Sequence, residues 1–457
     1  MKLRKVDITN FRCFSELSIP LHKDVNVIVG VNGTGKTAIL DAIAVGLAPI
    51  LQRLSSAGQR LKSGGFRDTD FRVMSAAPSD RGAAELADYA RVALETQEGV
   101  TWDNWRPSGQ KGAEPPVRLG LSSLDDYIAA WQPSQGGRSS SAPMPVFAYY
   151  GPDRGLLNIP DRLHRSKTDF SYRTSALVGA LDARSNFKEC LQWFDAAEAD
   201  ELRVNRDRVN GEFEETTELY AVRRAIRTVF GNTVENPRFV APSHKLVVNS
   251  IMPGGNGAQL RVDQLSHGYQ AMLAMIIDFA RRQALANPDY RSPDANDSLP
   301  SVLRESGPWS APGIILIDEI DLHLHPSWQQ RVIQDLRNAF PNTQIIVTTH
   351  SPQVLTTVHR ESIRILRGQK VYSASAGTYG TESKRPLEEV METPSRPPGN
   401  ENTEAISHLF AKINAGQLDE ADAICRGLME RMGVDEPALV EAQTIIENRR
   451  WEKELGL

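Results

Sequence analysis

GVNGTGKT, at Gly30–Thr37, fits the pattern GxxxxGK[ST] and sets the class of this chain. The residues before it, Val25–Val29 (VNVIV), form a short apolar run that is typical of a buried strand in a parallel sheet. The residues after it have an apolar face at helical spacing, made by Ile39, Leu40, Ile43, Ala44 and Leu47. A strand, a glycine-rich loop and a helix in this order predict a phosphate-binding loop.

Each residue type in such a loop has a different expected function. The glycines let main-chain N–H groups surround a phosphate, assisted by the N-terminus of the following helix. Lys36 is expected to reach the β- and γ-phosphates as a catalytic residue, and the hydroxyl of Thr37 is expected to bind Mg²⁺. We therefore predict ATP and Mg²⁺ as cofactors. The expected nucleotide-binding residues of the loop are Gly30, Asn32, Gly33, Thr34, Gly35, Lys36 and Thr37.

Composition limits the remaining choices. A chain of 457 residues is long enough for two or three domains, and its net charge of −5 excludes a uniformly basic nucleic-acid binder. Its three cysteines are far apart and form no CxxC pair, which argues against a disulfide framework or a zinc site. The longest apolar stretch, Ala38–Leu51, is interrupted by Asp41 and Pro49. We therefore expect a cytoplasmic protein without membrane contact.

A second buried-strand run, Gly313–Ile317 (GIILI), ends in Asp318 and Glu319. Carboxylates at the end of a parallel strand lie where ligands bind in an open α/β sheet. Asp318 is expected to hold Mg²⁺, and Glu319 to polarise the attacking water as the general base. Taken alone, the pair would also suit a strand that ends in a solvated acidic turn.

A histidine follows the next strand. Pro326–Phe340 has a helical apolar pattern, and Gln344–Val347 predicts a further strand that leads to His350. In this order the histidine can contact the γ-phosphate and sense its loss, so we predict a catalytic role. A purely structural histidine is the alternative.

The string LSHGYQ at Leu265–Gln270 precedes an apolar helix. Ser266 and Gly268 would present a hydroxyl and free N–H groups at the N-terminus of that helix, where anions bind. The string resembles the LSGGQ signature of ABC-type ATPases, with His267 at the first glycine position and Tyr269 inserted before the glutamine. In that class the signature closes over the nucleotide of another subunit, which implies a homodimer or a higher homo-oligomer.

Asp321 matches the loop that crosses the dimer interface in the same class, and it is added to the nucleotide-binding residues by resemblance. His323 and His325 follow it, at a spacing that permits chelation of a metal. The helix start at Pro326 favours packing and loop hydrogen bonds for these two histidines.

The N-terminal segment MKLRKVDITNFRCF resembles the first strand of the RecF, SMC and OLD group of ATPases. This resemblance implies that Arg12 contacts a nucleotide phosphate. The segment from Leu316 to Leu355 is similar to OLD-like AAA ATPases of bacterial defence islands. The tail, Gly380–Leu457, resembles the PtuA family, the ATPase subunits of Septu-type and some retron antiphage systems, which act with a separate HNH nuclease subunit, PtuB.

Nuclease motifs are missing where that group would carry them. OLD nucleases have a TOPRIM domain with a DxD pair after the histidine, but neither a DxD nor an HNH pattern follows His350. The resemblance therefore implies an ATPase that acts as sensor and scaffold and controls a separate nuclease of the HNH, PtuB-like kind. A reverse transcriptase and retron DNA are further implied partners. The alternatives are a RecF-like DNA-repair ATPase and an AriA-like ATPase that traps a TOPRIM effector.

The expected fold is α/β, an ABC-type P-loop head with an inserted, mostly helical region and a helical C-terminal tail. The predicted parts are an N-terminal lobe (1–100), the insertion (101–260), a C-terminal lobe (261–375) and a tail for partner docking (376–457). Within the insertion, Pro145–Tyr150 predicts a strand that leads to Arg154. This is the place of the family's Q-loop. This segment contains no glutamine, so Arg154 is the candidate for a site residue there.

The insertion also holds a group of basic residues that could bind the phosphates of DNA or RNA. The alternative is a solvated face whose charges pair with nearby acids. The residues are Arg162, Arg165, Lys167, Arg173, Arg203, Arg206 and Arg208.

Overall fold

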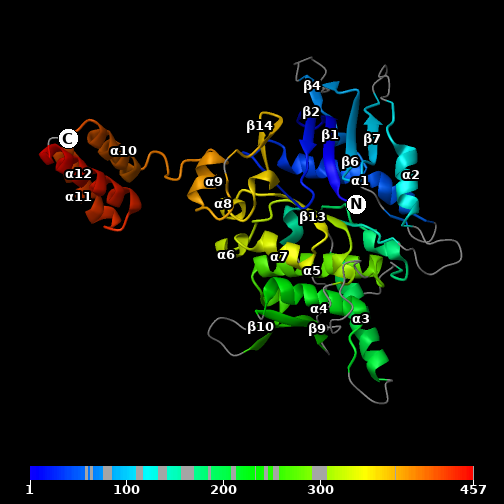
Figure 1. Cartoon of the computed structure of the whole chain (residues 1–457). Coiled ribbons are helices and arrows are strands. Elements are labelled where there is room, and N and C mark those ends of the chain that lie inside the picture. Colours follow the sequence, from blue (N-terminus) through cyan, green and yellow to red (C-terminus); the bar gives the residue numbers. More distant parts are fainter. Residues whose placement is uncertain are drawn as a thin grey trace. The chain divides into compact units, whose positions relative to one another are not determined.

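The computed structural model describes the chain except for residues 57–59, 62–64, 76–84, 110–116, 132–141, 156–168, 184–186, 207–212, 232, 241–244, 251–256, 291–305, 376 and 456–457. The described residues form two compact units, Met1–Pro386 and Leu387–Leu457 (Figure 1). The sequence predicts a tail that starts at residue 376, whereas the second unit starts at Leu387.

A six-stranded sheet forms the centre of the first unit, in the order β15-β14-β3-β13-β12-β8. Its strands are β3 (Val25–Val29), β8 (Val146–Tyr150), β12 (Gly313–Ile317), β13 (Thr343–Thr348), β14 (Ile363–Arg367) and β15 (Lys370–Ser373). All neighbours pair in parallel except β14 and β15. Every residue of β3, β8, β12 and β13 is buried, which explains why these strands are predominantly apolar. The predicted α/β class is confirmed.

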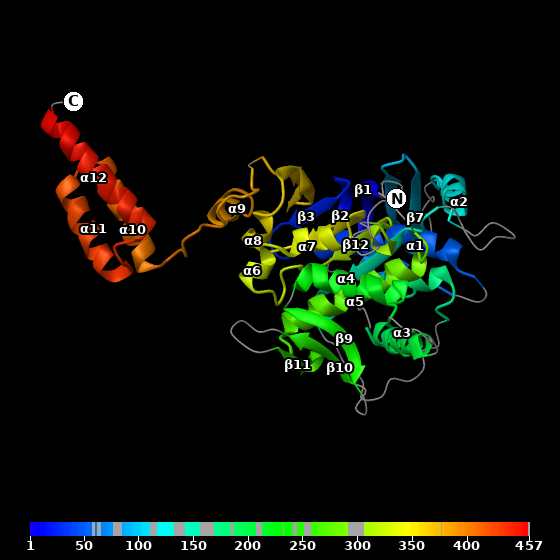
Figure 2. The ribbon, with the colours of Figure 1, turned by 60° about the horizontal axis from the view of Figure 1, so that its bottom comes forward.

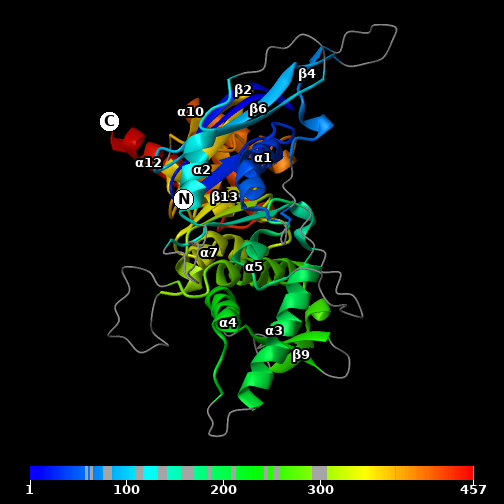
Figure 3. The same cartoon turned by 90° about the vertical axis from the view of Figure 1, so that its right-hand side faces the viewer.

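An antiparallel sheet of four strands lies beside the central sheet, in the order β2-β1-β6-β7 (Figure 3). Its strands are β1 (Leu3–Phe11), β2 (Phe14–Pro20), β6 (Tyr89–Thr96) and β7 (Thr101–Pro107). A short hairpin of β4 (Val73–Ser75) and β5 (Glu85–Leu86) adds to this lobe.

Helix α1 (Lys36–Leu54) contacts both the antiparallel sheet and the central sheet. Trp102 Nε1 donates to Gly46 O at 2.8 Å, and a methyl group at Gly46 would lie 2.8 Å from Leu94. Among the described helices, α1 alone is long and apolar enough to cross a membrane by length and composition. However, 78% of that window is buried within the protein, as in a core helix.

The insertion contains α2 (Leu121–Ala129), α3 (Lys188–Arg206) and α4 (Thr217–Phe230). It also contains β9 (Val234–Val240) and β10 (Lys245–Ser250), which form a three-stranded sheet with β11 (Ala258–Arg261), as Figure 2 shows. The sequence analysis did not predict this sheet. Before α3, residues Arg173–Leu177 form a 3₁₀ turn, and Gly179 follows it with φ at 64°.

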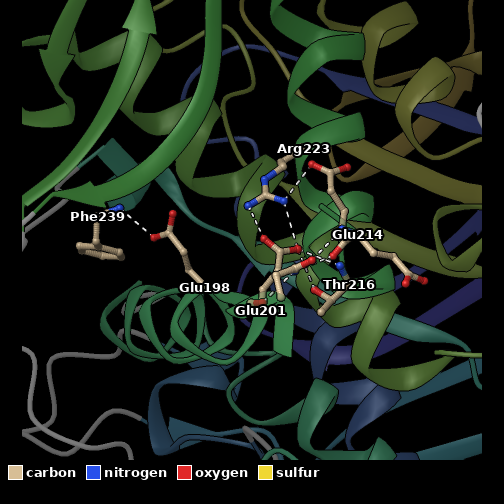
Figure 4. A network of polar contacts seen from close by, with 8 residues as sticks. Glu198, Glu201, Glu214, Thr216, Arg223 and Phe239 are labelled. Carbon is tan, nitrogen blue, oxygen red and sulfur yellow. Dashed lines mark hydrogen bonds and ion pairs between the residues drawn. The ribbon is translucent and has the colours of Figure 1, made fainter. Parts of the chain in front are cut away.

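A buried carboxylate holds the two long helices of the insertion together (Figure 4). Glu201 on α3 is 1% exposed and accepts hydrogen bonds from the guanidinium of Arg223, at 2.8 and 3.2 Å, and from Thr216 N at 2.8 Å. Thr216 is the N-cap of α4, so the same carboxylate also satisfies the start of that helix. Glu198 accepts from Phe239 N at 2.9 Å and ties β9 to α3.

The C-terminal lobe contributes α5 (His267–Ala286), α6 (Pro326–Gln329), α7 (Val332–Ala339), α8 (Pro352–Leu355) and α9 (Lys384–Glu389). Helix α5 is buried along most of its length and contacts α4 and β8. The helix expected over Pro326–Phe340 is divided into α6 and α7, because Arg331 leaves the helical conformation at φ −125°. The guanidinium of Arg331 lies over the ring of Trp328 at 5.1 Å.

The second unit is a bundle of α10 (Glu401–Asn414), α11 (Leu418–Met432) and α12 (Pro437–Leu455). The three helices share one apolar core, made by Ile406, Leu409, Ile413, Ala421, Cys425, Leu428, Leu439, Ala442 and Ile446. Asn400 caps α10 by accepting from Asn402 N and Thr403 N. The helical C-terminal region predicted from the sequence is confirmed.

Candidate functional site

The glycine-rich loop between β3 and α1 has a backbone that needs glycine. Gly33 and Gly35 have φ values of 81° and 102°, in the left-handed region that glycine adopts at little cost. A methyl group at Gly35 would lie 2.6 Å from Cys13 Sγ, and one at Gly30 would lie 2.7 Å from Leu366 O. The loop is therefore packed between the β1–β2 turn and β14, with no room for side chains at these positions.

Lys36 starts α1 and is 7% exposed. Its ammonium group donates to Gly30 O at 2.9 Å and to Val31 O at 3.1 Å, so it bridges its own loop. Burial lowers the pKa of Lys36, and the carboxylates of Asp318, Glu319 and Asp321 act in the opposite direction. The cation thus lies within the field of the acidic residues that follow β12.

Thr37 and Asp318 meet across the sheet. Thr37 Oγ1 donates to Asp318 Oδ2 at 2.7 Å, and Thr348 Oγ1 donates to Asp318 Oδ1 at 2.5 Å. Mg²⁺ takes oxygen ligands and commonly uses one or two protein groups together with phosphates and water. A hydroxyl and a carboxylate oxygen side by side beside a phosphate-binding loop fit that ion.

Glu319 has a left-handed backbone conformation, with φ at 50°. Such a conformation costs a residue other than glycine on the order of 1–3 kcal/mol and persists only where its surroundings impose it. Glu319 N donates to Thr348 Oγ1 at 2.7 Å, which fixes one side of the peptide. Because β3, β13 and β12 are parallel neighbours, the loop, the acidic pair and His350 follow the same edge of the sheet.

Asp321 is bonded within its own chain. Its Oδ1 accepts from Thr349 Oγ1 at 2.6 Å and from His350 N at 3.2 Å. The carboxylate therefore orients the turn that carries the predicted γ-phosphate sensor. A contact of Asp321 across a dimer interface stays a prediction.

The signature segment lies at the N-terminus of α5. Ser266 is the N-cap; it is exposed, and its hydroxyl makes no capping hydrogen bond. Gly268 is buried, and a methyl group there would lie 2.4 Å from His323 O, so this position requires glycine. Tyr269, the inserted residue, packs its ring 4.9 Å from that of Trp328.

A pocket of about 320 Å³ opens beside the signature segment. Its walls come from the start of α5 and from the loop after Asp321, and they combine aromatic, imidazole and hydroxyl groups. The lining residues are Ser266, Gly268, Tyr269, His323, Leu324, His325, Ser327 and Trp328. His325 accepts a hydrogen bond from Ser327 N and so caps α6.

Arg12 is paired with acids of its own chain. Its guanidinium lies 2.6 Å from Asp41 Oδ2 on α1 and 2.8 Å from Asp70 Oδ1. Burial acts to lower the pKa of Arg12, but the two carboxylates raise it overall. The side chain is beside the phosphate-binding loop, and its contact with a nucleotide phosphate stays a prediction.

Arg154 reaches the acidic turn from the end of β8. It lies in a 3₁₀ turn, Pro152–Gly155, and is 4% exposed. Its guanidinium donates to the main-chain oxygens of both Asp318 and Glu319 at 2.5 Å. The sequence marked Arg154 by its position after a strand, but no pattern in the sequence reveals these carbonyl partners.

The structure also shows that two residues for which the sequence predicts no role make hydrogen bonds at the site. Thr348 bonds both Asp318 and Glu319, and Thr349 bonds Asp321. Two hydroxyls at the end of a strand, next to an acidic strand end, are the signal that could have found them.

The basic residues of the insertion are described only in part. Arg162, Arg165, Lys167 and Arg208 lie outside the described residues. Arg173 donates to Ala286 O at 2.6 Å, and Arg203 pairs with Asp200 at 2.6 Å. Of these two side chains, Arg203 pairs with an acid, as the alternative predicts, whereas Arg173 bonds to a main-chain oxygen.

Two protein-family models match the chain. One is described as an AAA domain and matches residues 5–219; the other is described as an AAA domain, putative AbiEii toxin, Type IV TA system, and matches residues 194–356. Nucleotide binding is common to such domains.

The similar proteins include two retron ATPases and a Septu protein. The Retron Ec83 probable ATPase of Escherichia coli is 26% identical, over 99% of this chain and 88% of that protein. The Retron Vc95 probable ATPase of Vibrio cholerae serotype O1 biovar El Tor is 26% identical, over 87% of this chain and 80% of that protein. The Septu protein PtuA of Bacillus mycoides is 24% identical, over 77% of this chain but 38% of that protein.

Proposed function

Because this chain is an ATPase with AAA domains, related to retron ATPases and to Septu PtuA, we propose that it hydrolyses ATP between two copies of itself and so controls a separate nuclease in antiphage defence. The observation that carries the hydrolysis site is the 2.7 Å hydrogen bond between Thr37 and Asp318. This contact between the phosphate-binding loop and the acidic strand end supports a single Mg²⁺-nucleotide site at that place.

Different residues of this chain have different roles in the proposed reaction. The loop N–H groups and Lys36 bind the phosphates, and Mg²⁺, held by Thr37 and Asp318, would neutralise charge on the phosphate oxygens. Glu319 takes the proton of the attacking water as general base. His350, whose main chain is bonded to Asp321, senses the γ-phosphate.

The second copy completes each site. Ser266 has an exposed hydroxyl without a capping hydrogen bond, at the N-terminus of a helix of 20 residues. The unpaired N–H groups of such a terminus attract anions. We therefore infer that Ser266 and Gly268 bind the triphosphate held by the loop of another copy, so that association of two copies depends on ATP.

The second unit is the part we assign to partner docking. It has its own core, and α12 exposes Trp451 and Leu455, which are 64% and 56% exposed, four residues apart on one side of the helix. The proposed partner is an HNH nuclease subunit, because related ATPases belong to retron and Septu systems.

Coexpression with an HNH nuclease subunit of the PtuB-like kind tests the proposal. A stable complex whose DNA cleavage changes with ATP supports it. The matched variant Glu319→Gln should alter that response without dissociating the complex. A complex whose cleavage is the same with and without ATP would contradict regulation, and the absence of a complex would contradict docking.

A further inference from the structure

Resting on the proposed hydrolysis site, we propose that Arg154 is a positioning residue: it holds the Asp318–Glu319 turn so that the Glu319 carboxylate is aimed at the attacking water. The segment after β8, at the place of the Q-loop, has no glutamine. In this proposal Arg154 does not replace that glutamine by contacting the substrate. It acts through the main chain of the general base.

Among the residues that the structure describes, Arg154 donates hydrogen bonds to carbonyl oxygens. Nη1 donates to Gly151 O at 3.2 Å and to Asp318 O at 2.5 Å, and Nη2 donates to Glu319 O at 2.5 Å. The planar guanidinium thus spans two consecutive peptides of the turn. A lysine at this place would provide one compact ammonium group and could not span both oxygens in the same fixed geometry.

The need for such a clamp comes from the backbone of Glu319. Its left-handed φ of 50° is unfavourable for a glutamate, so other contacts must maintain it. Thr348 Oγ1 accepts from the Glu319 N–H, and Arg154 binds the Glu319 carbonyl. The two sides of the residue are therefore fixed by different elements: the end of β13 and the 3₁₀ turn that follows β8.

The charge of Arg154 has a second consequence. The guanidinium is 4% exposed and lies in the electrostatic field of Asp318, Asp321 and Glu319. Together with the ammonium group of Lys36, it is a buried cation beside this acidic turn. It offsets part of the repulsion among the three carboxylates before a nucleotide binds.

The same segment also contacts the signature helix. Tyr150, the last residue of β8, donates its hydroxyl to Asp278 of α5 at 2.9 Å. The 3₁₀ turn that carries Arg154 contacts α5 as well. The segment that carries Arg154 thus contacts both the turn of the general base and α5, the helix that Ser266 precedes as N-cap.

Arg364 provides a matched control for the test. It is also buried, at 7% exposure, and its guanidinium donates to three main-chain oxygens: Pro20 O, Glu361 O and Ile363 O. Burial lowers the pKa of Arg364 too. It lies on β14 and bonds no part of the acidic turn.

The experiment compares Arg154→Lys, Arg154→Met and Arg364→Lys in the full-length chain. Affinity for MgATP, the rate of one turnover and the melting temperature are measured for each. We expect Arg154→Lys to slow turnover by about tenfold or more, equal to about 1.4 kcal/mol, with MgATP affinity close to wild type. Arg364→Lys should keep the wild-type rate even if its melting temperature falls as much.

Two results would overturn the inference: wild-type turnover in Arg154→Lys, or an equal loss of turnover in Arg364→Lys. The double variant Arg154→Lys/Glu319→Gln separates this inference from the proposed function. If Arg154 acts through Glu319, the double variant should be no slower than Glu319→Gln. If Glu319→Gln alone keeps full turnover, the assignment of the hydrolysis site fails instead.

Discussion

The phosphate-binding edge of the central sheet and the signature segment differ in how their polar groups are satisfied. At the sheet edge, Lys36 and Asp318 are 7% and 1% exposed and are bonded within the chain. At the signature segment, Ser266 is exposed and its hydroxyl caps nothing. The polar groups of the sheet edge are thus paired within one copy, whereas the Ser266 hydroxyl makes no capping hydrogen bond. This difference supports the proposal that the signature segment binds a nucleotide held by another copy.

The largest expected effect comes from Lys36→Ala, which removes the cation of the assembled half. ATP binding should be lost, because Lys36 is the only loop residue with a side-chain positive charge for the phosphates. Isothermal titration with MgATP measures it. The control Lys370→Ala changes an exposed lysine on β15 and should bind ATP normally. Tight binding by Lys36→Ala would contradict the role of this loop.

Glu319→Gln should separate chemistry from binding. Loss of the general base is expected to slow hydrolysis by roughly 10²–10⁴-fold. ATP binding and ATP-dependent association should persist or increase, since the amide removes a negative charge near the triphosphate. Phosphate release and sedimentation report the two effects. The control Glu361→Gln alters an exposed glutamate on a short turn that follows α8. Unchanged hydrolysis in Glu319→Gln would reject the assignment.

Ser266→Arg tests the role of the signature segment. A bulky cation at the signature should prevent a second copy from closing over the nucleotide, while the loop of the same copy still binds ATP. Sedimentation with and without MgATP measures association. Ser407→Arg, on an exposed position of α10 in the second unit, serves as control. If Ser266→Arg associates normally with ATP, the composite site is wrong.

A smaller effect on the site is expected from Glu201→Gln in the insertion. This change replaces one of the two carboxylate partners of the half-buried Arg223 by a neutral amide. Breaking a buried ion pair commonly costs about 3–5 kcal/mol of stability, and the remaining pair with Glu215 should reduce the loss below that range. Denaturant unfolding measures it, with the exposed Glu420→Gln as control. ATP affinity should change little, because the network joins α3 to α4 and does not touch the loop. A loss of ATP affinity in folded Glu201→Gln would show that the insertion contributes to the site.

The sheet edge was largely predictable from the sequence, and the reasons are physical. Val25–Val29 and Gly313–Ile317 are buried on both faces, so their strands appear as short, mainly apolar runs with the observed bounds. The glycine pattern of the loop follows from backbone angles that other residues avoid. Local sequence therefore determines most of this region.

The remaining features depend on contacts between distant segments. The strands Val234–Val240 and Lys245–Ser250 are partly exposed and carry mixed residues, so no clear period identifies them. The bonds of Arg154 to Asp318 O and Glu319 O join residues far apart in the chain. The bonding of Asp321 within its own chain likewise became visible only in the structure.

The central claim is that each ATP lies between the loop of one copy and the signature of another. Mixing two inactive variants, Lys36→Ala and Ser266→Arg, tests it most directly. In a mixed dimer the intact loop of the Ser266→Arg copy would face the intact signature of the Lys36→Ala copy. If each ATP lies between two copies, ATPase turnover should reappear on mixing, although neither variant is active alone. A mixture that stays as inactive as its components would contradict this shared site.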